Sequence, residues 1–242
     1  MMFFKKPFVA RQNDSRGLRN PFFFPSFLPR VSPVASFGSN PGGLRMLVYA
    51  PVKIPRVRPL IVVLHGCGQS AASFADDAGW LAMARKYGVA LVLPEQTYEN
   101  NRGRCFNWFR RLDVARGSGE AMSIRQMVRT AVKRFGSDPR KIFIVGFSAG
   151  GGMAAALLAA YPAVFAAGGV VAGMPVGCAK SPTGAMLQMK RADRFRTRRG
   201  LADEVRAVTS FNERKVWPRL TIWQGELDRT VDPGNAESLA AQ

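Results

Sequence analysis

The segment that decides the fold is IFIVGFSAGGGMAAALL, residues 142–158. It begins as a run of β-branched apolar residues, which predicts a buried strand. The run stops at Gly146, and Ser148 follows inside the pattern Gly-Phe-Ser-Ala-Gly. Small residues typical of a tightly packed helix come next. A strand, a sharp turn and a helix in this order form the arrangement that exposes a nucleophilic serine.

Each position of this G-x-S-x-G pattern has a mechanical reason. Glycines at 146 and 150 remove the Cβ atoms that would clash in a tight turn around Ser148. The N-terminus of the following helix then places unpaired N–H groups beneath a reacting carbonyl. The alternative is a glycine-rich turn that only packs tightly. The strand before the turn and the helix after it favour the nucleophile.

A nucleophilic serine normally needs a histidine base, and the only histidine in the sequence is His65. It closes the apolar run PLIVVLHG, residues 59–66, which is typical of a strand buried on both faces. We expect His65 and Gly66 to support the loop that follows this strand. The alternative is that His65 is the catalytic base. In the α/β-hydrolase fold the histidine comes last, after the serine and the acid.

The loop after His65 is the candidate for an oxyanion hole. An α/β-hydrolase takes one N–H from the residue after the nucleophile, here Ala149, and one from a loop after an earlier strand. Gly66 and Gly68 let this backbone turn its N–H groups inward. We therefore expect the second donor to be the N–H of Cys67.

The candidate acid lies in WQGELDRTVDP, residues 223–233, where a predicted strand ends. The segment offers Glu226, Asp228 and Asp232. Asp228 is at the strand end where a triad acid would hold and stabilise an imidazolium. A carboxylate in a solvated turn is the alternative for this pattern alone.

Apolar strands alternate with helices from about residue 43 to residue 242, without an internal repeat. This order predicts an α/β fold: a mostly parallel sheet with helices on both faces, in three layers. Residues 1–42 hold six of the 16 prolines and show no helical or strand period. We expect them to form a disordered or loosely attached arm.

The charge is strongly basic, with 35 Lys and Arg against 16 Asp and Glu. Seven of the basic residues lie in residues 180–199, where Phe195 is the single aromatic residue, too few for a groove that stacks on bases. We expect a solvated face there and no nucleic-acid partner; binding to an anionic surface is the alternative. No stretch is apolar enough to predict a membrane span, and no intact export signal is visible.

Several motifs, in order over about residues 41–242, resemble the esterases related to extracellular poly(3-hydroxybutyrate) depolymerases. These are NPGGLRMLVYAP, LHGCGQSAASFA, LPEQ, CFNWF, GSGEAMSI, VGFSAGGGMAAALLAAYP, GMPVGCA and WQGELDRTVDP. The resemblance implies an α/β-hydrolase with Ser148 as nucleophile, Asp228 as acid, and the N–H groups of Cys67 and Ala149 as the oxyanion hole. It also implies an extracellular or periplasmic location.

The sequence departs from the family in one respect. The family places its histidine tens of residues after the acid, whereas the 14 residues after Asp228 contain none. We therefore expect a catalytic domain over residues 43–242 that is incomplete at its C-terminus. Its triad histidine would be missing and its activity impaired.

The expected function is hydrolysis of short-chain 3-hydroxyacyl esters, of the polyhydroxyalkanoate type, through an acyl-enzyme. A feruloyl or acetyl esterase acting on plant polysaccharide and a non-catalytic binding protein of the same fold are the alternatives. Phe106 and Trp108 are candidates for an acyl pocket or for a packed loop. We expect an ester or polyester substrate, a monomer, and neither cofactor nor metal.

Three cysteines are too few for a disulfide scaffold. Cys67 and Cys105 both flank the expected site, so a disulfide between their loops is one expectation and two free buried thiols are the other. Cys178 would then have no partner. A disulfide would suit an extracytoplasmic setting.

Overall fold

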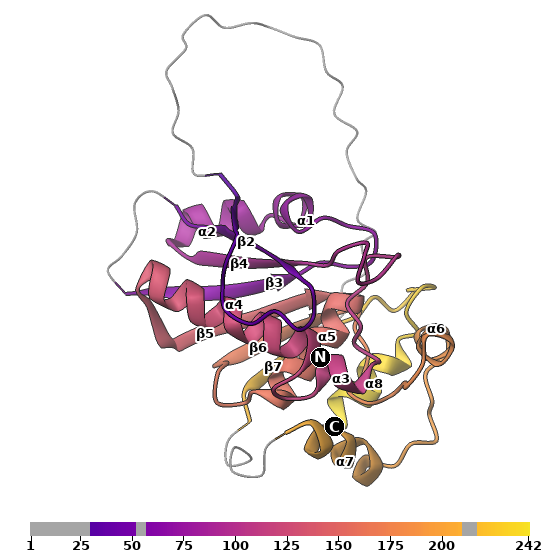
Figure 1. Cartoon of the computed structure of the whole chain (residues 1–242). Helices are drawn as coiled ribbons and strands as arrows, with labels where there is room; N and C mark the ends of the chain where they lie inside the picture. The colour runs from indigo at the N-terminus through magenta and orange to yellow at the C-terminus, as the bar shows by residue number, and fades with distance from the viewer. Residues whose placement is uncertain (1–29, 52–56, 210–216) are drawn as a thin grey trace, which may run out of the picture.

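The computed structural model describes residues 30–51, 57–209 and 217–242. A seven-stranded sheet runs through this part of the chain in the order β1-β2-β4-β3-β5-β6-β7 (Figure 1). β1 and β2, and β2 and β4, pair antiparallel, whereas all other neighbours are parallel. The strands are Ser32–Val34, Arg45–Tyr49, Arg58–Leu64, Ala90–Glu95, Ser137–Phe147, Ala167–Val171 and Arg219–Trp223, from β1 to β7. The prediction of a mostly parallel sheet is confirmed.

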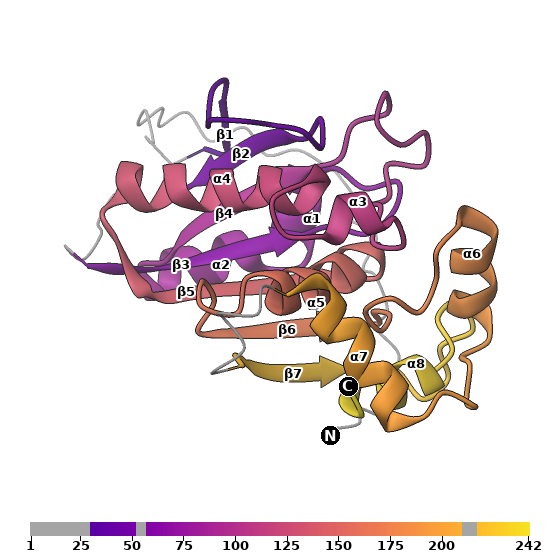
Figure 2. The ribbon, with the colours of Figure 1, turned by 60° about the horizontal axis from the view of Figure 1, so that its bottom comes forward.

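Helices cover both faces of the sheet. They are Ala71–Asp77, Trp80–Tyr87, Arg111–Val114, Gly119–Phe135, Ala149–Ala160, Pro182–Lys190, Arg198–Val208 and Gly234–Ala240, from α1 to α8. Alternate residues of β3 point to opposite faces: Leu60, Val62 and Leu64 pack with α4 and α5, whereas Val63 packs with α1 and α2. Figure 2 shows these two pairs of helices on opposite sides of the sheet.

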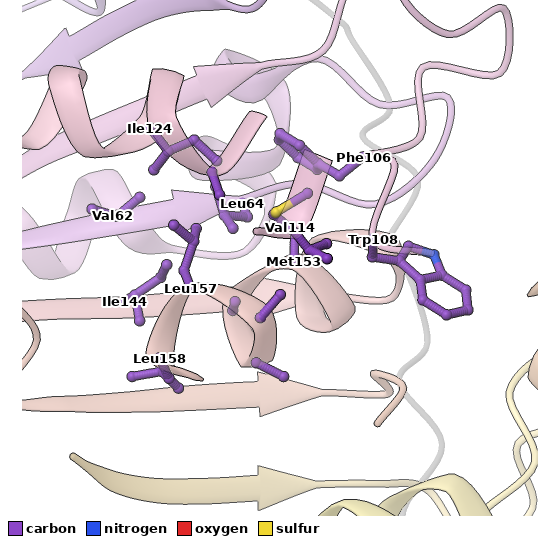
Figure 3. Close-up of a cluster of buried hydrophobic side chains, with 14 of the residues drawn as sticks. Val62, Leu64, Phe106, Trp108, Val114, Ile124, Ile144, Met153, Leu157 and Leu158 are labelled. Carbon is purple, nitrogen blue, oxygen red and sulfur yellow. The ribbon is translucent and has the colours of Figure 1, made fainter. Parts of the chain in front are cut away.

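The larger core cluster lies between the sheet and the two long helices. Figure 3 shows Ile124 of α4 and Met153 and Leu157 of α5 against side chains of β3 and β5. These three side chains have no exposed surface. Because burying a side chain of this size contributes about 1.5–3 kcal/mol, this cluster fixes α5 and the turn before it to the sheet.

The expectation of a disordered or loosely attached arm was wrong for residues 30–42. Ser32–Val34 pairs with β2 as an antiparallel edge strand. Phe37 is buried in the larger core, and Thr130 Oγ1 of α4 donates to its carbonyl at 3.2 Å. The prolines made this segment look irregular in the sequence. However, proline is tolerated in an edge strand, which is where this segment lies. Residues 1–29 of the expected arm lie outside the described residues.

Two other segments differ from the sequence pattern. From Ser70 to Tyr87 the sequence predicts one helix, whereas the structure has two, α1 and α2, because Gly79 between them has φ +77°. In the basic segment the structure has α7 at Arg198–Val208 and a second helix, α6 at Pro182–Lys190, which the sequence pattern did not reveal. Ser181 begins α6 by accepting the Gly184 N–H at 3.1 Å, a side-chain cap.

Candidate active site

The candidate nucleophile Ser148 lies between the end of β5 and the start of α5. Its backbone has φ 55° and ψ −118°, which a residue with a side chain rarely adopts. Its N–H donates to Val171 O of the neighbouring strand at 2.9 Å. A Cβ at Gly146 would collide with Gly150 O, and one at Gly150 with Leu64 O. Only glycine therefore fits on either side of this serine.

The two candidate oxyanion donors lie at the ends of adjacent strands, because Leu64 of β3 pairs with Gly146 of β5. Ala149 is the first residue of α5, so its N–H has no acceptor within the helix. Cys67 is exposed in the turn after β3. No acceptor for its N–H is found within the described ranges, whereas the N–H groups on either side of it are both bonded.

Those two bonds fix the shape of the oxyanion loop, residues 66–69. The Gly66 N–H donates to Gln69 Oε1 at 2.8 Å, and the Gly68 N–H donates to Gly103 O at 2.9 Å. Arg104 also donates to Gly68 O at 2.6 Å. The loop is therefore held at both ends, with the Cys67 N–H between them.

His65 lies directly before this loop and is fully buried. Its Nδ1 atom lies 2.7 Å from Gly66 O, and its Nε2 atom accepts the Gln96 N–H at 3.1 Å. These contacts require the neutral tautomer with its proton on Nδ1. Burial lowers the pKa of His65. Both ring nitrogens are occupied by backbone, so the ring has no free atom to accept a serine proton.

The candidate acid Asp228 lies in the loop between β7 and α8. Its Oδ1 atom accepts the N–H groups of Thr230 at 2.8 Å and Val231 at 3.0 Å, and Gln224 Nε2 donates to Oδ2 at 3.1 Å. β5, β6 and β7 are parallel and in register, so Ser148 and Asp228 follow strand ends at the same edge of the sheet (Figure 2).

The other two carboxylates of this segment have different surroundings. Glu226 is exposed. Asp232 accepts the Gly234 N–H at 2.8 Å and the Ala192 N–H at 3.2 Å, so it joins the start of α8 to the segment after α6. Neither environment resembles that of an acid held for an imidazole, which leaves Asp228 as the candidate.

A disulfide joins Cys67 to Cys105 in the structure. It ties the oxyanion loop to the loop that precedes the aromatic segment Phe106–Trp108. Cys178 is a free, buried thiol, and burial raises its pKa to about 12. A thiol with this pKa stays protonated at neutral pH and is unreactive while the protein is folded.

The two candidate acyl-pocket residues lie in different surroundings. Phe106 has no exposed surface, and its ring centroid lies 4.9 Å from that of His65. Of the two alternatives for Phe106, the enclosed ring favours the packed loop. Trp108 lies against α5, where a Cβ at Gly152 would be 2.9 Å from its Cγ atom. Figure 3 shows its indole at the margin of the core, pointing away from the cluster.

The sequence analysis gave no role to four buried or half-buried polar residues at this edge. Gln69 fixes the oxyanion loop, and Gln224 fixes the candidate acid. Gln96 and Glu120 form a buried cluster behind His65. Each polar residue stands in a quoted motif, and a polar residue beside a buried strand is the signal that could have revealed it.

The basic segment lies largely on the surface. Lys180 Nζ is 3.9 Å from Glu204 and Arg194 is 4.0 Å from Asp232, with the two cationic side chains 82% and 72% exposed. Ion pairs this exposed contribute about 0–1 kcal/mol. The segment therefore has the character of a solvated face. In the described part of the chain, no helix has the length and apolar character needed to cross a membrane.

Residues 45–242 match the family model described as Esterase PHB depolymerase. Poly(3-hydroxyalkanoate) depolymerase C of Paucimonas lemoignei is 38% identical over 213 residues, which are 88% of this chain and 50% of that protein. Feruloyl esterase B of Talaromyces stipitatus is 30% identical over 210 residues, 85% of this chain and 58% of that protein. The chain thus spans little more than half the length of these two relatives.

Among solved structures, an acetyl xylan esterase from Aspergillus awamori superimposes with a TM-score of 0.81 at 27% identity, covering 88% of this chain and 78% of that chain. Structure and sequence agree that the chain has the α/β-hydrolase fold and belongs to the esterase PHB depolymerase family of carboxylic ester hydrolases.

Proposed function

We propose that the chain is a serine esterase domain in which Ser148 attacks an ester carbonyl and forms an acyl-enzyme. One observation carries the proposal: the backbone of Ser148 at φ 55° between two glycines that no other residue can replace without a collision. Backbone strain costs about 1–3 kcal/mol and persists where the surrounding structure enforces it, as at a nucleophile elbow.

The neighbouring groups suit the steps of this reaction. A base takes the hydroxyl proton as the Ser148 oxygen bonds to the carbonyl carbon, and later returns it to the leaving alcohol. The carbonyl oxygen becomes an oxyanion that would accept the N–H groups of Cys67 and Ala149. The tetrahedral intermediate collapses, the alcohol leaves with a proton, and water then hydrolyses the acyl-enzyme. Asp228, fixed by three N–H donors, would orient and stabilise an imidazolium.

The base is the missing part of this machinery. His65 is the only histidine, and both of its ring nitrogens bond to backbone. Full activity would therefore need a base from outside residues 1–242. Removing a triad histidine lowers kcat by roughly 10⁶ in a well-studied protease, while the oxyanion hole and binding retain roughly 10³–10⁴ over water. We infer slow turnover that still depends on Ser148.

For the substrate we propose short-chain 3-hydroxyacyl esters of the polyhydroxyalkanoate type. The 38% identity to poly(3-hydroxyalkanoate) depolymerase C supports this class. Feruloyl or acetyl esters of plant polysaccharide are the second candidate, supported by feruloyl esterase B and by the fold match to the acetyl xylan esterase.

Parallel assays with a 3-hydroxybutyrate oligoester, methyl ferulate and an acetylated xylo-oligosaccharide test this choice. The Ser148→Ala variant supplies the background rate for each. We expect the largest rate above background on the oligoester. A larger Ser148-dependent rate on methyl ferulate or on the acetylated sugar would replace the proposed substrate with that one.

We also propose an extracellular or periplasmic monomer. The Cys67–Cys105 disulfide supports this location, because disulfides persist in oxidising compartments. Measuring the molar mass by light scattering tests the monomer, and an elution as a dimer at micromolar concentration would contradict it.

A further inference from the structure

Glu120 is a fully buried carboxyl group that the proposed reaction does not use. It lies in the first turn of α4, behind the candidate site. Three side-chain amides donate to its Oε1 atom: Gln96 at 2.6 Å, Asn107 at 2.7 Å and Asn100 at 3.0 Å. The Asn107 N–H donates to Oε2 at 2.9 Å. One carboxyl group thus accepts hydrogen bonds from three residues of the loop between β4 and α3.

The first branch of this cluster leads to the oxyanion loop. Gln96, whose amide bonds to Glu120, donates its backbone N–H to His65 Nε2 at 3.1 Å. His65 in turn donates from Nδ1 to Gly66 O at 2.7 Å. Gly66 directly precedes Cys67, the candidate oxyanion donor. A chain of three hydrogen bonds therefore runs from Glu120 to the peptide group that carries that donor.

The second branch leads to the aromatic segment Phe106–Trp108. Asn107, at its centre, is bonded to Glu120 through both its backbone and its side chain. Phe106 packs on the ring of His65, and Trp108 packs on the first turn of α5 behind Ser148. Glu120 is therefore the point where the two branches meet.

We propose that Glu120 is a positioning residue of the oxyanion hole, which holds the oxyanion loop through Gln96 and His65 and the aromatic segment through Asn107. The proposal rests on the function proposed above, since it assigns a purpose to the Cys67 N–H. Glu120 touches neither Ser148 nor a reacting atom; it acts through the two branches.

The chemistry of the cluster explains why a carboxyl group is required. Its two oxygens accept four N–H groups and both keep lone pairs whether or not the group is protonated, whereas a glutamine would turn an NH₂ group toward donors. A buried network that is partly satisfied destabilises the groups that it should hold. Glu120→Gln therefore preserves the volume and removes the acceptor pattern.

The single histidine offers a direct readout of the first branch. With ¹⁵N-labelled histidine, the spectrum contains the ring signals of His65 alone. The structure predicts one neutral tautomer with the proton on Nδ1 at pH 7.5, and a pKa below the usual value because the ring is buried. In Glu120→Gln we expect a mixture of tautomers or a ring that titrates. This change would not follow from a general loss of stability.

The second readout is the slow hydrolysis of p-nitrophenyl butyrate by the full chain. Since removing an oxyanion donor costs about 10²–10³ in kcat, displacing one should lower kcat about tenfold with KM within twofold. Ser123→Ala is the matched control. Ser123 is buried one turn further along α4 and bonds to Gly42 and Gly119, away from both branches. It should keep wild-type values in both readouts.

If Glu120→Gln does not fold, the same two readouts are measured on Gln96→Ala. This variant removes the hydrogen bond between Gln96 and Glu120, the first step of the first branch, and leaves Glu120 three other hydrogen bonds. A folded variant in which either readout stays at the wild-type value overturns the proposal. The proposed function fails separately, when Ser148→Ala hydrolyses the ester as fast as the wild-type chain. The histidine spectrum then still reports on the network.

Discussion

The ring of His65 accepts the backbone N–H of Gln96, 31 residues further along the chain, at 3.1 Å. Gln96 follows β4 and His65 follows β3, so this bond joins the ends of two parallel strands. The other ring nitrogen donates to Gly66 O. A histidine bonded in this way supports the loop that would bind the oxyanion and cannot also be the base.

Replacing His65 with glutamine should destabilise the fold. The Gln96 N–H and the Gly66 carbonyl would each lose a buried partner, which costs about 1–3 kcal/mol per group. Urea denaturation at pH 7.5 measures the change in the free energy of unfolding. A variant as stable as the wild-type chain would contradict the structural role of the ring.

The pH dependence of stability offers an independent test of His65. Its pKa in the folded chain is below the usual 6.5 because the ring is buried. The unfolded chain therefore binds the proton more readily, and stability should fall as the pH drops below about 6.5. His65→Gln should lose this component, which a pH series of urea midpoints would show. An identical acid slope in both proteins would contradict it.

Glu120 should give the pH dependence of stability the opposite sign. Burial raises its pKa to about 8 from 4.5; the hydrogen bonds that it accepts from Asn107 and Gln96 lower the pKa, and the Asp113 charge raises it. Between these two values the folded chain holds a proton that the unfolded chain releases, so stability should fall as the pH rises from about 4.5 to about 8. Glu120→Gln does not titrate and should remove this slope from the thermal midpoints. Equal slopes in the two proteins would exclude the shift.

The serine turn should tolerate no side chain at Gly150. A Cβ there would collide with the carbonyl groups of Leu64 and His65. We expect Gly150→Ala to lower the free energy of unfolding by at least the roughly 1–3 kcal/mol typical of an overpacked core. Gly225→Ala is the matched control, since its nearest atom would be 3.9 Å away. Similar stability losses in the two variants would contradict the steric argument.

The cysteines should be distinguishable by titration. Under denaturing conditions without reductant, we expect one free thiol per chain, Cys178, and three after reduction. In the folded protein Cys178 should not react at pH 8, because burial raises its pKa to about 12. Three free thiols without reductant would contradict the disulfide and leave the oxyanion loop tied by hydrogen bonds alone.

The strand-turn-helix around Ser148 was predictable because all of its determinants are local: a β-branched run, two glycines and small helical residues. The mostly parallel sheet with helices on both faces followed from the alternation of strands and helices. The strand at Ser32–Val34 was not predictable in this way, because its apolar neighbours come from β2.

The polar cluster around Glu120 could not be predicted from the sequence for a similar reason. Gln96, Asn107 and Glu120 come from three separate motifs, and only the fold brings their amides to one carboxyl group. The sequence could indicate that His65 belongs to the loop after β3, but not which groups its two nitrogens bind. The sequence left two roles open for Phe106 because an aromatic residue near a site can line a pocket or pack a loop.

The most direct test of the central claim is the hydrolysis of p-nitrophenyl butyrate by the full chain with and without added imidazole, with Ser148→Ala as background. The claim is that Ser148 is a nucleophile whose base is absent from these 242 residues. It predicts slow turnover that requires Ser148 and that rises with imidazole, which substitutes for the missing base. Equal rates for the wild-type chain and Ser148→Ala, with and without imidazole, would contradict it.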